Sequence, residues 1–171
     1  FGGRAELEKG LDEVLAADPH FNVGSYGTVI HEMSEAYVIG KKGFGQFAVG
    51  NEPIHHMLHM YAYAGKPSKT QFWVRRSLTE LYESGFGNGY GFPGDEDEGE
   101  MSAWYVLNAM GFYSAAPGHG EYILSSPLFN SVTLSLENGR TFKIEAPAND
   151  EEHFYIESAT WNNQVYDKPY L

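Results

Sequence analysis

Two carboxylates in an acidic loop, Asp95 and Asp97, have the residue type and spacing to carry out chemistry. They belong to the run PGDEDEGEMSAWY at residues 93–105, where five carboxylates occupy six positions before an apolar segment. In an extended segment, side chains two residues apart point the same way and can share a proton or orient a water molecule. The same acids can instead form only a solvated loop and helix N-terminus, where carboxylates favour the positive end of the helix dipole.

Familiar metal-binding motifs are incomplete in this sequence. An EF-hand loop counted from Asp95 would have glycine at position five and valine at twelve, where glycine at six and glutamate at twelve are required. HEMSE at residues 31–35 has Glu35 where a zinc-protease helix needs its second histidine. His55 and His59 are one helical turn apart and can hold a transition metal, but no cysteine and no clear third ligand accompany them. They can equally line a sugar or polar pocket or lie in the core.

Aromatic residues accompany the acidic loop in the sequence: Tyr90, Phe92, Trp104 and Tyr105. A sugar ring offers CH faces to aromatic rings and hydroxyl edges to carboxylates, so this combination favours a carbohydrate-active enzyme. Two alternatives stay open from the residues alone. One is a non-catalytic carbohydrate-binding module, and the other is a folding unit with no ligand of its own.

The elements that must position these residues are predicted to be helices first and strands second. Apolar residues at helical spacing predict five helices, at residues 4–17, 28–39, 51–64, 68–84 and 101–110. Thr28, Asn51 and Ser68 are the expected N-caps. The last helix carries almost no charge, so we expect it to be buried on most sides. The glycine-rich stretch 85–99 is a long loop, and such loops tend to be functional.

Strands are expected after Pro117. Asn138-Gly139 is a two-residue hairpin signal between two alternating segments that contain Val132, Leu134, Leu136, Phe142 and Ile144. The segment 154–156 and a turn near residues 162–163 indicate one or two further strands. Helices followed by strands predict an α+β chain with a domain boundary at residue 117, separating 1–117 from 118–171.

Composition limits the class of protein. With 171 residues, 42% hydrophobic and 15% aromatic, the chain has the material for a packed core. A formal net charge of −12 argues against nucleic acid and anionic membranes as partners, because both need clustered Lys and Arg. There are no cysteines, and no apolar run is long enough for a transmembrane helix. The chain opens on FGGRAELEKGLDEVL without an initiator Met or signal-peptide pattern, so we expect a C-terminal fragment of a longer protein.

Three long blocks resemble one known family. They are GNEPIHHMLHMYAYAGKPSKTQFWVR at 50–75, GFPGDEDEGEMSAWYVLNAMGFYSAAPG at 91–118 and EYILSSPLFNSVTLSLENGRTFKI at 121–144. These blocks look like the C-terminal part of glycoside hydrolase family 92, the calcium-dependent exo-acting α-mannosidases, many of which cleave α-1,2 linkages. The resemblance implies the end of an (α/α)6 barrel, followed by strands that pack back on a β-sandwich domain.

The resemblance also implies residue roles. The inverting base of the family's GDED segment corresponds to Asp97, with Asp95 as its partner on the same water. The Asn-Glu of the family's GNEP segment lies at calcium, which makes Asn51 and Glu52 the metal candidates. The His-Glu pair of its HEM segment, here His31 and Glu32, resembles the leaving-group subsite of α-1,2-specific members. We add His55 as a further candidate for substrate binding.

One departure from the family pattern affects activity. The family's general acid is a glutamate in an EGN-type segment, and no such segment occurs in these 171 residues. The resemblance therefore implies that this chain carries the base side and much of the calcium site, and that the chain alone is inactive on unactivated mannosides. It further implies an extracytoplasmic enzyme of N-glycan degradation, whose partners are mannose-containing glycans and the remainder of the parent chain.

Overall fold

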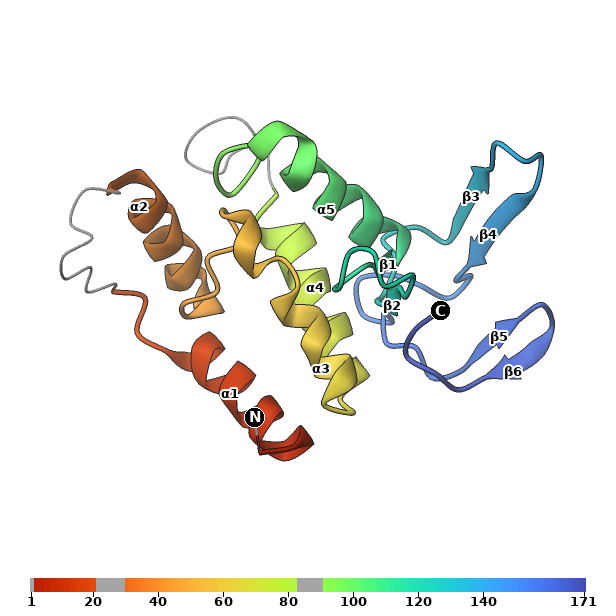
Figure 1. Cartoon of the computed structure of the whole chain (residues 1–171), viewed down its shortest axis with the longest axis horizontal. Coiled ribbons are helices and arrows are strands. Elements are labelled where there is room, and N and C mark those ends of the chain that lie inside the picture. The colour runs from red at the N-terminus through yellow and green to blue at the C-terminus, as the bar shows by residue number, and fades with distance from the viewer. Residues whose placement is uncertain (1, 21–29, 83–90) are drawn as a thin grey trace.

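A computed structural model describes residues 2–20, 30–82 and 91–171. The helices pack together at one end of the molecule. Of the three two-stranded sheets, two extend at the other end, and the first lies between them and the helices (Figure 1). The α-helices are α1 (Arg4–Ala16), α2 (Ile30–Ile39), α3 (Met60–Tyr63), α4 (Pro67–Glu80) and α5 (Glu100–Met110). The prediction of a mixed chain with helices first and strands second is confirmed for the described residues. No helix in the described ranges combines the length and apolarity needed to cross a bilayer.

Four of the five predicted helices form, with small differences at their ends. α4 begins at Pro67, whose fixed φ suits the first helical position, so Ser68 is not its N-cap as predicted. Thr28, the predicted cap of α2, lies outside the described residues. α5 buries Met101, Trp104, Asn108 and Ala109, but leaves Val106 51% exposed. Only Ala103 and Val106 of the eleven residues of α5 are exposed, so the helix is buried or half-buried on most sides, as expected.

The predicted continuous helix at 51–64 is wrong. The segment forms two short 3₁₀ turns, η3 (Glu52–Ile54) and η4 (Met57–His59), before the single turn of α3. The indole N–H of Trp104 donates to the His55 carbonyl at 3.0 Å, and the amide of His59 bonds the His56 carbonyl in a 3₁₀ pattern at 3.1 Å. Asn51 occupies the cap position of η3, but its side chain makes no cap hydrogen bond. A side chain from α5 thus replaces part of the helical ladder.

The main core lies between the helices. Its largest fully buried side chains include Trp104, Tyr61, Phe44, Phe47, Ile39, Leu58 and Leu81. Trp104 is at its centre, where it stacks on Tyr82 with the ring centroids 5.6 Å apart and the planes within 10°. Because Trp104 belongs to α5 and follows the acidic loop directly, the core anchors that loop from its C-terminal side.

The strands form three separate antiparallel pairs. These are β1 (Phe112–Tyr113) with β2 (Ile123–Leu124), β3 (Ser131–Ser135) with β4 (Thr141–Glu145), and β5 (Ala159–Trp161) with β6 (Gln164–Tyr166). The hairpin predicted around Asn138-Gly139 is confirmed, with Leu134 opposite Phe142. Asn162 and Asn163 both have positive φ, 50° and 64°, as a two-residue hairpin turn requires. Pairing of β1 with β2 crosses residue 117, and the domain boundary there stays a prediction.

The strand predicted at residues 154–156 is wrong. Its backbone bonds to a side chain instead of a neighbouring strand, since the Ile156 amide donates to Gln71 Oε1 of α4 at 2.9 Å. The ring of Phe154 lies 5.4 Å from the guanidinium of Arg75, also on α4. Contacts made by helix side chains therefore hold this segment in place of a β ladder.

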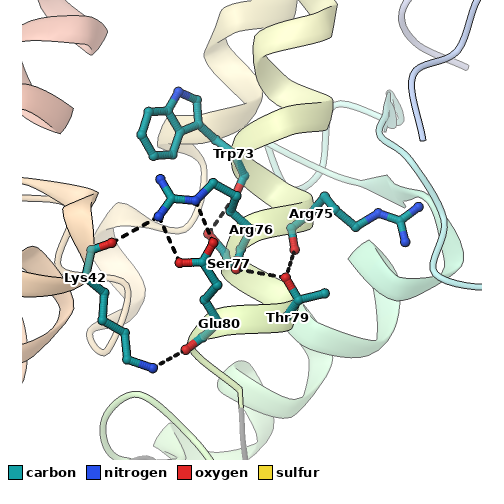
Figure 2. Close-up of polar contacts among 7 residues, drawn as sticks. All are labelled: Lys42, Trp73, Arg75, Arg76, Ser77, Thr79 and Glu80. Atoms are coloured by element: carbon teal, nitrogen blue, oxygen red, sulfur yellow. Dashed lines mark hydrogen bonds and ion pairs between the residues drawn. The ribbon is translucent and has the colours of Figure 1, made fainter. Parts of the chain in front are cut away.

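Two consecutive arginines of α4 tie the helix to opposite parts of the molecule, and Figure 2 shows their side chains leaving in opposite directions. Arg76 forms an ion pair with Glu80 at 2.6 Å, donates to the Lys42 carbonyl at 3.0 Å, and lies over the Phe44 ring at 4.6 Å. It thereby holds the turn that follows α2. Arg75 is buried and donates to the Pro127 carbonyl at 2.8 Å, beside β2, which links the helices to the strand region.

Candidate active site

Two glycines bring the candidate site residues together from distant parts of the chain. A Cβ built on Gly94 would lie 2.2 Å from the carbonyl oxygen of Gly50 and 2.6 Å from its Cα. Only hydrogen fits between these backbones, so both positions require glycine. Gly50 is followed directly by Asn51-Glu52, and Gly94 by Asp95-Glu96-Asp97. The contact therefore places the two sequence-predicted motifs side by side.

The carboxyl group of Asp97 meets that of Glu52 at this junction. Desolvation is the largest cause that raises the pKa of Asp97, followed by the negative charges of Glu52 and Asp95 and a hydrogen bond with the Glu52 side chain. Asn51, Glu52, Asp95 and Asp97 are all exposed residues, so water screens these charges in part. Glu52 and Asp95 thus both act on Asp97, although more than 40 residues separate Glu52 from the two aspartates.

The backbone between the acids differs from the sequence expectation. Asp97 and Glu98 have φ values of 54° and 56°, and Gly99 has 105°, so three residues in succession are left-handed. The premise of an extended segment is therefore wrong. Asp95 influences Asp97 through charge, not through a shared strand face. For residues with a Cβ this conformation is strained, and such strain is typical of functional sites.

Glu96 caps the turn that carries Asp97. Its carboxylate accepts from the Gly99 amide at 2.6 Å and from the Ser102 hydroxyl at 2.7 Å. The hydrogen bond from Ser102 is the first cause that lowers the pKa of Glu96, and the Gly99 amide also lowers it. Sequence reasoning gave this acid no role. No standard capping signal pointed to it, because glutamate is not among the preferred N-cap residues.

His55 lies behind the junction and is 2% exposed. One ring nitrogen faces the Val49 carbonyl at 3.0 Å and the other faces Glu100 Oε1 at 3.2 Å. Glu100 also accepts from the hydroxyl of Tyr113 at 3.3 Å. The ring therefore joins the residue before Gly50 to the first turn of α5. This is a bridging position between the two motifs, and both nitrogens are occupied by protein groups.

His59, the second histidine of the predicted pair, lies in the core. His59 is fully buried, with Nε2 2.8 Å from Asn108 Oδ1 and its ring 4.7 Å from that of Tyr113, so it is a core histidine. Burial lowers its pKa to about 4. His31 and Glu32 belong to α2, and their side chains, like Tyr90, lie outside the described part of the structure.

The side chains at the junction offer oxygen ligands of the kind that calcium prefers. Calcium prefers carboxylate and amide oxygens, which Glu52 and Asn51 offer, and a cation there would offset the repulsion between Glu52 and Asp97. Calcium takes about six to eight oxygens. Among the side chains that the structure describes, no three histidine or carboxylate groups converge as a metal-binding group. The described residues therefore do not complete a shell.

Comparison with known proteins decides the family. The model of the glycosyl hydrolase family 92 catalytic domain matches residues 1–171, the whole chain. The chain belongs to glycosyl hydrolase family 92. Because that model describes a catalytic domain, family 92 membership does not favour the alternative of a separate carbohydrate-binding module.

Solved family 92 structures have the same fold over this region. A family 92 inverting mannosidase of Bacteroides thetaiotaomicron VPI-5482 is 40% identical, with a TM-score of 0.76 over 99% of this chain and 22% of its own. A family 92 α-mannosidase of Bacteroides thetaiotaomicron, solved with mannoimidazole, is 30% identical, with a TM-score of 0.79 over 99% of this chain and 20% of its own.

A fungal relative extends the comparison. An uncharacterized secreted glycosidase of Arthroderma benhamiae is 29% identical over 126 residues, which is 72% of this chain and 16% of that protein. The chain thus spans about a fifth of the solved family 92 structures it matches, and less of this relative.

Proposed function

We propose that this chain forms part of an α-mannosidase that releases terminal α-linked mannose from glycans. The observation that carries the proposal is the 40% identity to a family 92 inverting mannosidase across 99% of the chain. The approach of Glu52 to Asp97 at the Gly50–Gly94 contact supports it, because glycoside hydrolysis needs a carboxylate placed by the fold to activate water. The preferred linkage in this proposal is α-1,2.

In the proposed inverting mechanism Asp97 is the general base. Its carboxylate takes a proton from water as that water attacks the anomeric carbon from the face opposite the leaving oxygen. Asp95 holds the same water. A carboxylic acid on the other face protonates the leaving oxygen, and we assign this acid to a part of the protein outside residues 1–171. A base with a raised pKa takes up the proton more readily than an ordinary aspartate.

Calcium is part of the proposal, with Asn51 and Glu52 as its ligands from this chain. When bound, calcium would hold the mannose hydroxyls and help to distort the ring. His31 and Glu32 are proposed to contact the sugar on the leaving-group side. His55 was a candidate for sugar binding, and its buried bridge between Val49 and Glu100 favours a supporting role behind these residues.

The proposed architecture follows the family. Residues 1–117 would contribute helices to an (α/α)6 catalytic barrel and residues 118–171 strands to a β-sandwich. A two-stranded hairpin is marginal by itself, and Val165 on β6 is 90% exposed, which suits strands that pack against another part of the protein. We propose an extracytoplasmic location, consistent with the secreted description of the fungal relative. The substrates would be mannose-containing glycans such as N-glycans.

The test uses the full-length protein and mannobioses of defined linkage. Wild type should release mannose from α-1,2-mannobiose faster than from other linkages, and proton NMR should show β-mannose as the first product. Chelation should abolish this release and added calcium should restore it. Initial α-mannose would refute inversion, and activity unaffected by chelation would refute the calcium site.

A matched pair of variants tests the base. Asp97→Asn should abolish hydrolysis while leaving the binding of a mannose-like inhibitor largely intact, because the amide cannot accept the proton. Glu98→Gln, one residue further along the same exposed loop, is the control and should keep wild-type activity. Equal loss in both variants would show that loop charge matters and that Asp97 is not a specific base.

A further inference from the structure

The turn that carries Asp97 is strained and needs a group to hold it. Asp97 and Glu98 are left-handed residues with a Cβ, and they stand directly before left-handed Gly99. In this conformation the Cβ approaches the following carbonyl, so an unsupported loop tends to return to negative φ. Strained residues persist only where the surrounding structure over-determines them. The question is which contact does so here.

Glu96 makes the contacts that close this turn. Its two carboxylate oxygens accept separately from the Gly99 amide and the Ser102 hydroxyl, at 2.6 and 2.7 Å. Its own carbonyl accepts from the Met101 amide at 3.2 Å. These bonds join the residue before Asp97 to residues that follow Glu98. Since hydrogen bonds to a charged carboxylate are the stronger kind, the side chain of Glu96 is suited to oppose the strain.

We propose that Glu96 is a positioning residue, whose bonds to Gly99 and Ser102 hold the left-handed turn that brings Asp97 to Glu52. Both oxygens of Glu96 are committed to its own loop, so it contacts no substrate in this role. The inference rests on the proposed function for its effect on catalysis. Its effect on the backbone is independent of any activity.

Kinetics in the full-length protein test the catalytic consequence. Glu96→Ala should lower kcat by about tenfold to a hundredfold while KM stays within about twofold, because a loosened base costs the chemical step more than substrate binding. Ser102→Ala removes one of the two side-chain bonds and should cause a smaller loss. Glu98→Gln leaves both bonds in place and should behave as wild type. A Glu96→Ala variant with wild-type kcat would overturn the proposal.

Relief of strain gives the sharper test. Glycine at position 98 adopts positive φ without the steric strain of a Cβ, so Glu98→Gly should restore part of the kcat that Glu96→Ala loses. A residue that contacted substrate directly would not be rescued in this way. Failure of the double variant to exceed Glu96→Ala in kcat, with both proteins folded by circular dichroism, would therefore overturn the positioning role.

Thermal unfolding tests the turn without any substrate. While Glu96 holds the strained turn, Glu98→Gly should raise the unfolding midpoint by about 2 °C. In the Glu96→Ala background the turn has already relaxed, so the same change should raise the midpoint little or not at all. An equal rise in both backgrounds would show that Glu96 does not hold the turn. If wild type releases no mannose but the two backgrounds differ as expected, the proposed function fails and the role of Glu96 stands.

Discussion

Replacing Gly94 with alanine should separate the two halves of the candidate site. The new Cβ would lie 2.2 Å from the Gly50 carbonyl oxygen and within 2.7 Å of two further Gly50 backbone atoms. An ordinary van der Waals contact begins at 3.4 Å, so the two backbones must move apart by about 1 Å. No side-chain rotation relieves this contact, because every near atom belongs to the backbone.

The expected losses follow from that displacement. A misplacement of about 1 Å costs on the order of a hundredfold in rate, and overpacking costs about 1–3 kcal/mol of stability. Gly94→Ala in the full-length protein should therefore lower kcat/KM on an α-mannoside about a hundredfold. It should also lower the free energy of unfolding measured with urea.

The control separates the steric effect from the added methyl group. Gly10 lies inside α1, and a Cβ there meets nothing within 4 Å, so Gly10→Ala should keep full activity and gain about 1 kcal/mol from helix propensity. If Gly94→Ala keeps kcat/KM within about threefold of wild type, the close backbone contact does not position the site.

Three further predictions concern stability, each measured by urea denaturation. Lowering the pH from 6.5 to 4 should lower the free energy of unfolding by about 3 kcal/mol through His59. Burial lowers the pKa of this histidine to about 4, so only the unfolded chain takes up a proton in that window. His59→Gln should flatten the dependence of stability on pH there, and an unchanged slope would contradict this. Arg75→Met should lower the free energy of unfolding by about 2–4 kcal/mol, because the Pro127 carbonyl and the Ser126 hydroxyl lose the guanidinium that donates to them. A loss below about 0.5 kcal/mol would show that water replaces the guanidinium as donor. Arg76→Ala should cost about 1–2 kcal/mol of stability, because it removes the contacts with the Phe44 and Trp73 rings and the ion pair with Glu80. Arg76→Lys should recover only part of this loss, since lysine lacks the planar guanidinium. Full recovery by lysine would refute this account.

The helices that were predicted correctly, and the one that was not, show when the spacing of apolar residues is enough to predict a helix. α1, α4 and α5 follow from the spacing of their apolar residues, which a helix of 3.6 residues per turn places on one face. The segment 51–64 has similar spacing but forms 3₁₀ turns, because the Trp104 indole takes the His55 carbonyl. Trp104 is 49 residues away, so no window around residue 55 contains that information.

The sequence by itself determined the chemical types at the site and the family to which they belong. The carboxylates Glu52, Asp95 and Asp97 were identifiable because acids in a glycine-flanked loop, and the long blocks around them, are local features of the chain. Only the tertiary structure decided how they meet. The Gly50–Gly94 contact joins residues 44 positions apart, and the left-handed φ angles of Asp97 and Glu98 do not follow from the propensities of these residue types. Local spacing encodes which face a residue takes, whereas close backbone approach arises only when distant segments pack.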